Sequence, residues 1–204
     1  IHPFNKVNEE FLQKFNPKAI ILSGGPASVL NDNAPKPPLS IYDLEIPILG
    51  ICYGQQIMMK MLGGSVVSGS GTSEFGKSFV NINNKSKDIK FLEGLFLDEG
   101  KEEVWMSHGD HVASIPEDFE VYCISENAPY AIIGNEKKHF YGVQFHPEVF
   151  HTLNGKVLIK NFLKLSNFSF NWSMKSYLQQ SVEEIKMKVG NKKVICALSG
   201  GVDL

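Results

Sequence analysis

A Gly-X-Cys-X-Gly segment at residues 50–54 constrains the fold of this chain more than any other feature. It follows an apolar run at 46–51 and precedes a stretch with helical spacing at 55–62. A strand that turns this sharply into a helix needs glycines, because side chains there would clash with the neighbouring strand and helix. The turn lifts the central residue clear of a sheet and places it at a helix N-terminus, where the helix dipole favours a thiolate. We therefore predict that Cys52 is a nucleophile.

Apolar runs alternate with amphipathic stretches along much of the chain. This pattern predicts an α/β fold with a mainly parallel sheet flanked by helices. We expect strands at 19–22, 46–51, 79–82, 104–106, 119–125, 131–134, 140–145 and 193–198. We expect helices at 7–15 with Asn8 as N-cap, at 55–62, at 156–165 and at 173–189 with Ser173 as N-cap. The run at 19–22 has the composition of a strand buried on both faces.

A second motif supplies the groups that a cysteine nucleophile requires. His146 ends the apolar run at 140–145 and is followed by Pro147 and Glu148. The carboxyl ends of parallel strands meet at one edge of a sheet, so His146 can serve Cys52 as a base. Residues i and i+2 of an extended backbone share a face, so Glu148 can orient the imidazole. His108 is a weaker candidate for the base, because no acid follows it in this pattern.

These motifs together resemble the signature blocks of the class I glutamine amidotransferases. The similar blocks are Gly-Ile-Cys-Tyr-Gly-Gln-Gln at 50–56, Gly-Val-Gln-Phe-His-Pro-Glu at 142–148 and Ser-Gly-Gly-Pro at 23–26, which matches the family's oxyanion loop. The resemblance implies a flavodoxin-like fold in which Cys52 attacks the side-chain amide of L-glutamine. It implies that His146 acts first as base and then as acid, that Glu148 orients His146, and that Gln56 contacts the substrate. It implies no cofactor and no metal for this step.

Two N–H groups are candidates for stabilising the tetrahedral oxyanion, which needs a pair of aimed donors. The N–H of Tyr53 comes directly after the nucleophile, and the N–H of Gly25 lies in a loop where a missing side chain lets the backbone approach closely. In the family, the segment at 105–110 lies along the glutamine pocket. Ser107 and the Gly109 backbone are therefore predicted substrate contacts.

The segments at 73–76 and 105–110 are most similar to the GMP synthetase branch of the family. The residues Ser199, Gly200, Gly201, Val202 and Asp203 look like the start of the pyrophosphate-binding loop of N-type ATP pyrophosphatases, although Leu204 stands where that loop normally has Ser. Glycines after a buried strand let successive N–H groups surround an anion. The resemblance implies a glutamine amidotransferase domain over 1–166. It implies a linker and the first helix and strand of an adenine-nucleotide α-hydrolase-like domain over 167–204.

In the full-length enzymes of this branch, ATP and Mg²⁺ serve to adenylate XMP, and ammonia from glutamine then displaces AMP to give GMP. The resemblance implies a homodimer formed through a region beyond Leu204, so this chain would at most hydrolyse glutamine. We also expect the family's first strand and helix to be missing before Ile1, which would leave an unpaired strand edge and marginal stability. The alternatives are a glutaminase of the anthranilate or carbamoyl-phosphate synthetase type and an inert regulatory module.

Composition limits the partners and the cellular compartment that we expect for this chain. All 20 basic residues are Lys and the formal net charge is −2, which argues against a nucleic-acid partner. The longest uncharged apolar stretch, at 46–59, falls short of the roughly 20 residues of a membrane span, and no signal peptide opens the chain. Cys52, Cys123 and Cys196 show no CxxC spacing, which indicates a reducing, cytoplasmic setting with neither a disulfide framework nor a zinc site. We expect structural roles for Cys123 and Cys196.

Overall fold

The computed structural model describes residues 1–69, 73–96, 100–170 and 174–195. The chain divides into two compact units, Ile1–Phe168 and Ser169–Leu204. The predicted nucleotide loop at 199–203 lies outside the described residues, as do Cys196 and the predicted N-cap Ser173.

The first unit contains strands and helices in a mixed order along the chain. Its strands are β1 (Ile20–Leu22), β2 (Ile48–Ile51), β3 (Ser65–Ser68), β4 (Glu74–Ile82), β5 (Lys101–His108), β6 (Asp110–Ser114), β7 (Glu120–Ile124), β8 (Ile132–Asn135) and β9 (Phe140–Val143). Its α-helices are α1 (Glu9–Phe15), α2 (Tyr53–Met61) and α3 (Gly155–Leu165). Short 3-10 helices are η1 (Phe4–Lys6), η2 (Leu39–Asp43), η3 (Asn84–Ser86) and η4 (Lys90–Leu92).

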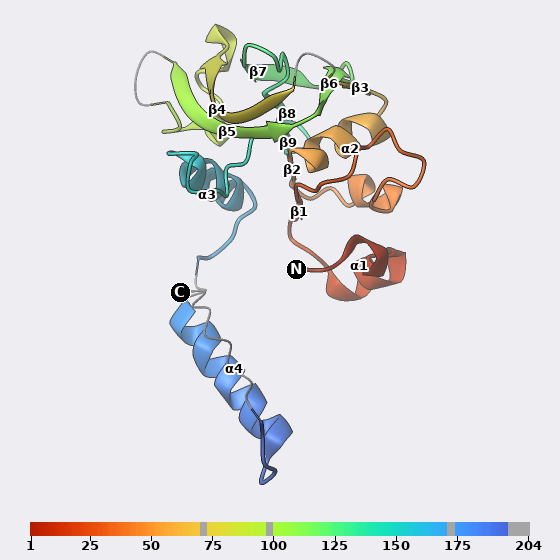
Figure 1. Cartoon of the computed structure of the whole chain (residues 1–204), viewed down its shortest axis with the longest axis vertical. Coiled ribbons are helices and arrows are strands. Elements are labelled where there is room, and N and C mark those ends of the chain that lie inside the picture. Colours follow the sequence, from red (N-terminus) through yellow and green to blue (C-terminus); the bar gives the residue numbers. More distant parts are fainter. Residues whose placement is uncertain (70–72, 97–99, 171–173, 196–204) are drawn as a thin grey trace. The chain divides into compact units, whose positions relative to one another are not determined.

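Within the described residues, the main sheet has seven strands in the order β1-β2-β9-β8-β7-β4-β5 (Figure 1). The pairings β1–β2 and β2–β9 are parallel, and those from β9 onward are antiparallel. The predicted α/β class is confirmed, but the prediction of a mainly parallel sheet is wrong. The physical reason is loop length: β8 ends at Asn135 and β9 begins at Phe140, whereas parallel neighbours need a crossover of about a dozen residues.

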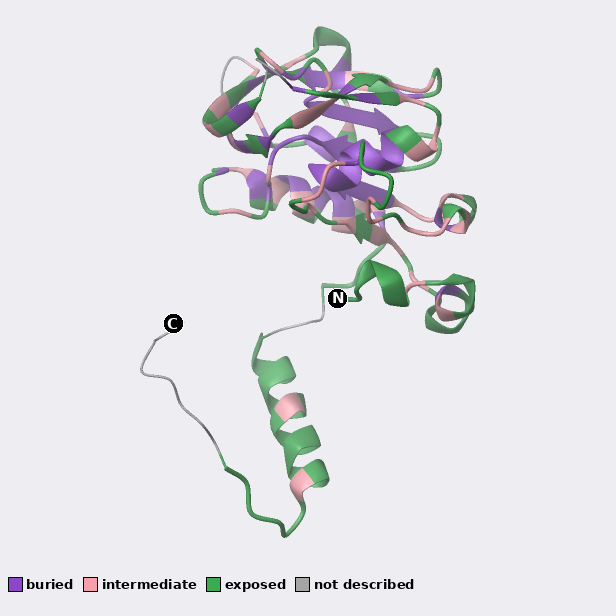
Figure 2. Cartoon of the chain, turned by 45° about the vertical axis from the view of Figure 1, so that its right-hand side comes forward, coloured by how far each residue is buried: buried purple, intermediate pink, exposed green. Residues whose placement is uncertain are grey.

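Helices α2 and α3 pack on opposite faces of the sheet. Successive side chains of a strand point to opposite faces, and β2 shows this directly. Ile48 lies in one apolar cluster with Met58 of α2, and Leu49 lies in the other with Phe162 of α3. Figure 2 shows the buried residues concentrated in the sheet and in the helix against it. The strand that leads into Cys52 is therefore buried on both faces.

Strand β1 forms an edge of this sheet in the part of the chain that the structure describes. Its side chains are only partly covered, and Ile21 is 46% exposed. The prediction that the run at 19–22 is buried on both faces is therefore wrong. The neighbouring helix α1 buries only Leu12, which shares an apolar cluster with the partly buried Ile20 and Leu22 of the strand.

The helix starts follow the sequence closely. Helix α1 begins at Glu9, and the side chain of Asn8 accepts a hydrogen bond from the N–H of Phe11 at 2.8 Å, which confirms the predicted cap. Helix α2 begins at Tyr53, two residues before the predicted start, because Cys52 itself occupies the N-cap position.

A two-stranded antiparallel sheet, β3–β6, was not predicted. Only Gly109 separates the end of β5 from the start of β6, so the chain passes there from the main sheet to the small one. Val66 and Val112 of the small sheet share an apolar cluster with helix α2. This packing holds the segment 107–110 close to the N-terminal half of α2.

The second unit contains helix α4 (Met174–Val189), which confirms the predicted helix over its described residues. Its apolar side chains, including Tyr177, Leu178 and Ile185, are exposed. The described part of the predicted strand at 193–198, residues 193–195, has no regular secondary structure. Among the described residues, none of the helices is long and apolar enough to cross a bilayer.

Candidate active site

Cys52 lies on a strained turn between β2 and α2. Its backbone has φ 50° and ψ −106°, which places a non-glycine residue at positive φ, where L-residues are uncommon. A Cβ at Gly54 would lie 1.9 Å from the carbonyl oxygen of Leu22, and one at Gly50 would lie 2.6 Å from the N of Gln55. Both flanking glycines are therefore required by close packing, as the motif predicted. The Cys52 side chain is 5% exposed.

His146 interacts with both other members of the predicted triad. Its Nδ1 lies 2.7 Å from Oε1 of Glu148, and its ring is close enough to the thiol of Cys52 for the two groups to interact. The interaction with Cys52 and then the bond to Glu148 outweigh burial and raise the pKa of His146 to about 10. Burial raises the pKa of Glu148, but its hydrogen bond to His146 prevails and the pKa is lowered overall. The raised pKa makes the His146 imidazole a stronger base than a free one.

Thr152 clamps the backbone of His146 to strand β5. The N–H of His146 donates to the carbonyl of Trp105 at 3.0 Å, and the Thr152 hydroxyl donates to the carbonyl of His146 at 2.7 Å. The same hydroxyl accepts from the N–H of Trp105 at 3.0 Å. Thr152 is 3% exposed. Our sequence reasoning missed it, because nothing in the sequence shows that residue 152 folds back onto β5.

A cavity of about 520 Å³ opens beside the nucleophile. All five residues predicted to bind substrate or stabilise the oxyanion line it. Its lining includes Gly25, Pro26, Ala27, Ser28, Cys52, Tyr53, Gln56, Phe75, Ser107, His108, Gly109, Asp110 and His146. A larger cavity of about 690 Å³ borders α1 and β1 but contains neither Cys52 nor His146, so the smaller one is the candidate site.

Gln144 lies against the nucleophile and was not singled out from the sequence, although it belongs to the block at 142–148. Its Nε2 lies 3.7 Å from the Sγ of Cys52, and its Oε1 accepts from Nε2 of Gln56 at 3.3 Å. The same Gln56 amide donates to the carbonyl of Asp110 at 2.7 Å. The carbonyl of Ser107 lies 3.5 Å from the Cys52 Sγ. Gln56 and Ser107 therefore sit next to the nucleophile, while their contacts with substrate stay predictions.

The loop after β1 approaches the triad closely. A Cβ at Gly24 would lie 2.8 Å from Cε1 of His146 and 3.7 Å from Cβ of Cys52. At Gly25, the nearest atom to an added Cβ would be Cγ of Tyr53, at 4.0 Å. The structure thus brings both predicted oxyanion donors to the cavity that contains Cys52. Their role in catalysis stays a prediction.

The other cysteine that the structure describes, Cys123, is a poor nucleophile. Cys123 is fully buried in β7, and burial strongly raises the pKa of its thiol. It fits the structural role expected from the sequence. No three His, Cys, Asp or Glu side chains among the described residues come together as a metal site.

Comparison with known proteins identifies the class. Residues 1–165 match the family model described as "Glutamine amidotransferase class-I". The chain belongs to this family. A solved glutamine amidotransferase from Thermotoga maritima superposes with a TM-score of 0.54 and 26% identity over 84% of this chain and 72% of that one. The solved structure of a proposed GMP synthase component from Thermoplasma acidophilum gives a TM-score of 0.62 and 27% identity over 83% of this chain and 76% of that one.

Curated relatives are more similar still. The chain is 56% identical over 203 residues to a protein of Dinoroseobacter shibae named "GMP synthase [glutamine-hydrolyzing]", and 55% identical to the protein of the same name from Ruegeria sp. (strain TM1040). Each match covers 100% of this chain but only 38% of the relative. The chain thus spans well under half the length of these relatives.

Proposed function

We propose that this chain is the glutaminase portion of a GMP synthetase, which hydrolyses L-glutamine through a thioester on Cys52. The observation that carries the proposal is the contact of Cys52 with His146, which is itself bonded to Glu148, at the edge of a cavity. A thiol, a base and an orienting carboxylate in this order are the parts that nucleophilic acyl transfer needs.

In the first half-reaction, the thiol proton moves to His146 and the thiolate attacks the side-chain amide carbon of glutamine. A C–S bond forms, and the carbonyl electrons move onto oxygen. We assign the N–H groups of Gly25 and Tyr53 to this oxyanion, because both residues line the cavity with Cys52. When the intermediate collapses, the C–N bond breaks and the imidazolium gives its proton to the departing amine, which leaves as ammonia.

In the second half-reaction, water hydrolyses the glutamyl thioester. His146, now neutral, takes a proton from the water as it attacks. The imidazolium returns that proton to the sulfur as the C–S bond breaks, which restores the thiol and releases glutamate. Glu148 keeps the imidazole oriented through both steps, since its bond to Nδ1 leaves Nε2 for Cys52 and water. The substrate contacts we propose are Gln56, Ser107 and the Gly109 backbone, which all line the cavity.

We further propose that the ammonia serves the ATP- and Mg²⁺-dependent amination of XMP to GMP by a synthetase portion of a longer, homodimeric protein in the cytoplasm. The identity to proteins named glutamine-hydrolysing GMP synthase supports this acceptor. The residues 199–203, proposed as the start of an ATP-binding loop, lie outside the described residues.

The decisive experiment measures glutamate release from glutamine by the purified chain, together with labelling of Cys52 by a diazo-ketone analogue of glutamine. Both should vanish in Cys52→Ala and persist in Cys123→Ala, a matched control in which a buried cysteine is removed. A folded chain that neither releases glutamate nor becomes labelled would refute the glutaminase proposal.

The acceptor is tested separately with a chimera. This chain replaces the corresponding 38% of the Dinoroseobacter shibae relative, and GMP formation is measured with glutamine or with ammonia as the nitrogen source. We expect both to support synthesis, and Cys52→Ala to abolish only the glutamine-dependent reaction. Glutamate release without any glutamine-dependent GMP formation would contradict the proposed acceptor and leave the glutaminase intact.

A further inference from the structure

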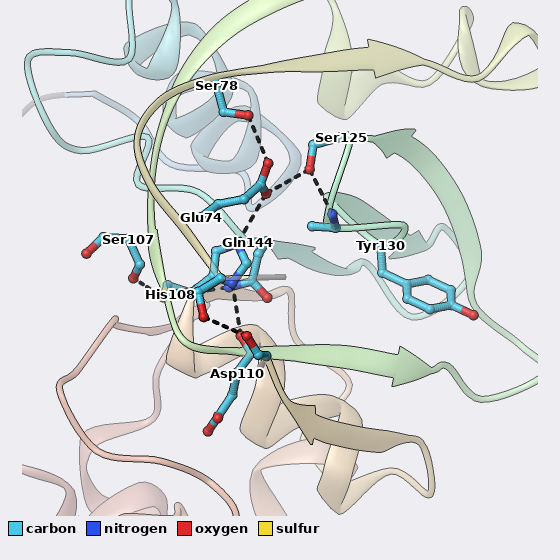
Figure 3. Close-up of polar contacts among 12 residues, drawn as sticks. Glu74, Ser78, Ser107, His108, Asp110, Ser125, Tyr130 and Gln144 are labelled. Atoms are coloured by element: carbon cyan, nitrogen blue, oxygen red, sulfur yellow. Dashed lines mark hydrogen bonds and ion pairs between the residues drawn. The ribbon is translucent and has the colours of Figure 1, made fainter. Parts of the chain in front are cut away.

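A second histidine–carboxylate pair lies beside the same cavity, and the chemistry described above does not use it. Glu74 begins β4 and His108 ends β5, and the register of the two antiparallel strands places them opposite each other. The Nε2 of His108 lies 3.3 Å from Oε2 of Glu74. Glu74 is 7% exposed and His108 4%. Figure 3 shows this pair and the contacts that surround it.

Hydrogen bonds hold the carboxylate of Glu74 in its ionised form. Ser78 donates to Oε1 at 3.0 Å, and Ser125 donates to Oε2 at 2.9 Å. Burial raises the pKa of Glu74, but the bonds from His108, Ser125 and Ser78 prevail and lower it overall. Ser125 is in turn fixed, because its hydroxyl accepts from the N–H of Ala128 at 3.0 Å.

Both ring nitrogens of His108 are engaged away from the nucleophile. Nε2 faces the carboxylate of Glu74, and Nδ1 lies 3.1 Å from the carbonyl oxygen of Asp110. Both of these partners accept hydrogen bonds, so neither ring nitrogen is directed at Cys52. This geometry argues against His108 as the base, and the reason differs from the missing neighbouring acid noted in the sequence.

The pair fixes the wall of the cavity formed by residues 107–110, which we call the 107–110 wall. The carbonyl of Asp110 accepts from His108 Nδ1 at 3.1 Å and from Gln56 Nε2 at 2.7 Å. Through Gln56 the connection continues to Gln144, whose amide lies against the Cys52 sulfur. A continuous run of buried polar contacts thus joins Glu74 to the nucleophile.

We propose that Glu74 and His108 are positioning residues that fix the 107–110 wall and so set the affinity of the site for its amide substrate. This inference rests on the proposed glutaminase function. The geometry supports it, because two buried side chains hold the Asp110 carbonyl from two sides, and the Ser107 carbonyl of the same wall faces the thiol. An error of about 1 Å in such a wall would misplace the groups that face the bound substrate.

The test compares Glu74→Ala with Glu74→Gln in the full chain. The amide of Glu74→Gln can donate to Nε2 of a neutral His108, which still donates from Nδ1 to Asp110, so the wall keeps its anchor. Glu74→Ala removes the anchor. We expect Glu74→Ala to raise KM for glutamine about tenfold with kcat changed less than about threefold, and Glu74→Gln to restore KM to within about threefold of wild type.

Two further readouts separate positioning from general damage. Labelling of Cys52 by the diazo-ketone analogue of glutamine should slow about tenfold in Glu74→Ala, while alkylation by iodoacetamide, which does not fill the pocket, should change less than about threefold. Hydrogen exchange of residues 107–112 should accelerate about tenfold or more, with helix α3 unchanged as the internal control.

Several results would overturn the proposal. A folded Glu74→Ala with wild-type KM and wild-type exchange at 107–112 would do so, and so would a loss confined to kcat. If Glu74→Ala does not fold, Ser125→Ala decides, since it removes one donor to the carboxylate: we expect about a threefold rise in KM, and an unchanged KM refutes the proposal. If wild type releases no glutamate, the proposed function fails. Hydrogen exchange at residues 107–112 then remains as the test of whether Glu74 and His108 fix the 107–110 wall.

Discussion

The two histidine–carboxylate pairs beside the cavity differ in how their partners are supplied. In the His146–Glu148 pair, two residues separated by one proline meet at the end of one strand, and the Glu148 side chain is 47% exposed. In the His108–Glu74 pair, partners 34 positions apart meet across two strands, with side chains that are 1% and 7% exposed. The first leaves one ring nitrogen for the thiol, whereas the second uses both. The same two side-chain types therefore serve as a reactive pair in one place and as an anchor in the other.

The largest expected difference concerns the chemical step. His146→Asn removes the proton acceptor, so kcat for glutamine should fall about 10³-fold. Iodoacetamide alkylation of Cys52 should slow as well, because the thiolate loses its cationic partner. His108→Asn is the matched control and should act mainly on KM. Equal losses of kcat in the two variants would contradict the assignment of His146 to the chemical step and of His108 to positioning.

The next difference concerns stability. Glu74→Ala leaves the buried His108 ring without its carboxylate partner and should lower the free energy of unfolding by about 3 kcal/mol, as for other broken buried pairs. Glu148→Ala removes a half-exposed partner and should cost about 1 kcal/mol or less. Urea denaturation of both variants measures this contrast. A larger loss for Glu148→Ala would show that exposure does not govern the strength of these pairs.

The pH dependence of catalysis sharpens the comparison further. The pKa of His146 is raised to about 10 in the free enzyme, so the imidazolium should persist through neutral pH and kcat/KM should fall as pH rises through that value. Glu148→Gln removes one of the two interactions that raise this pKa, so the alkaline fall should move to lower pH. Profiles of kcat/KM against pH for wild type and Glu148→Gln test this. An unshifted alkaline limb would mean that a different group controls it.

The smallest expected effect concerns the clamp on His146. Thr152→Val removes the hydroxyl that joins the carbonyl of His146 to the N–H of Trp105, and kcat should fall about tenfold as the ring loses its position. Thr152→Ser keeps the hydroxyl and should stay within about threefold of wild type. Steady-state kinetics of both variants provide the test. Equal activity of the two would argue that β5 alone holds the catalytic histidine.

The sequence predicted the first pair and missed the second for a physical reason. Cys52, His146 and Glu148 lie in short motifs whose geometry is set by a local turn or by adjacent residues, so spacing alone is informative. The contact of Glu74 with His108 depends on the register of β4 against β5, which the short apolar runs do not specify.

The same limit explains the wrong sheet direction. Short apolar runs identified at least part of all seven strands of the main sheet, but a run of Ile, Val and Phe is alike in parallel and antiparallel pairings. The two runs that form β8 and β9 are separated by only a few residues, which is too short for a parallel crossover. This spacing was the feature of the sequence that indicated an antiparallel pair.

The loop after β1 limits the positions that the His146 ring can take. An added Cβ at Gly24 would lie 2.8 Å from the imidazole of His146, so the loop fits against the ring with no spare room. A shift of the loop toward the ring by less than the width of a methyl group would therefore wedge the imidazole away from the sulfur. Glycine at this position leaves space for the ring orientation that faces Cys52. Even the methyl group of an alanine would displace the ring.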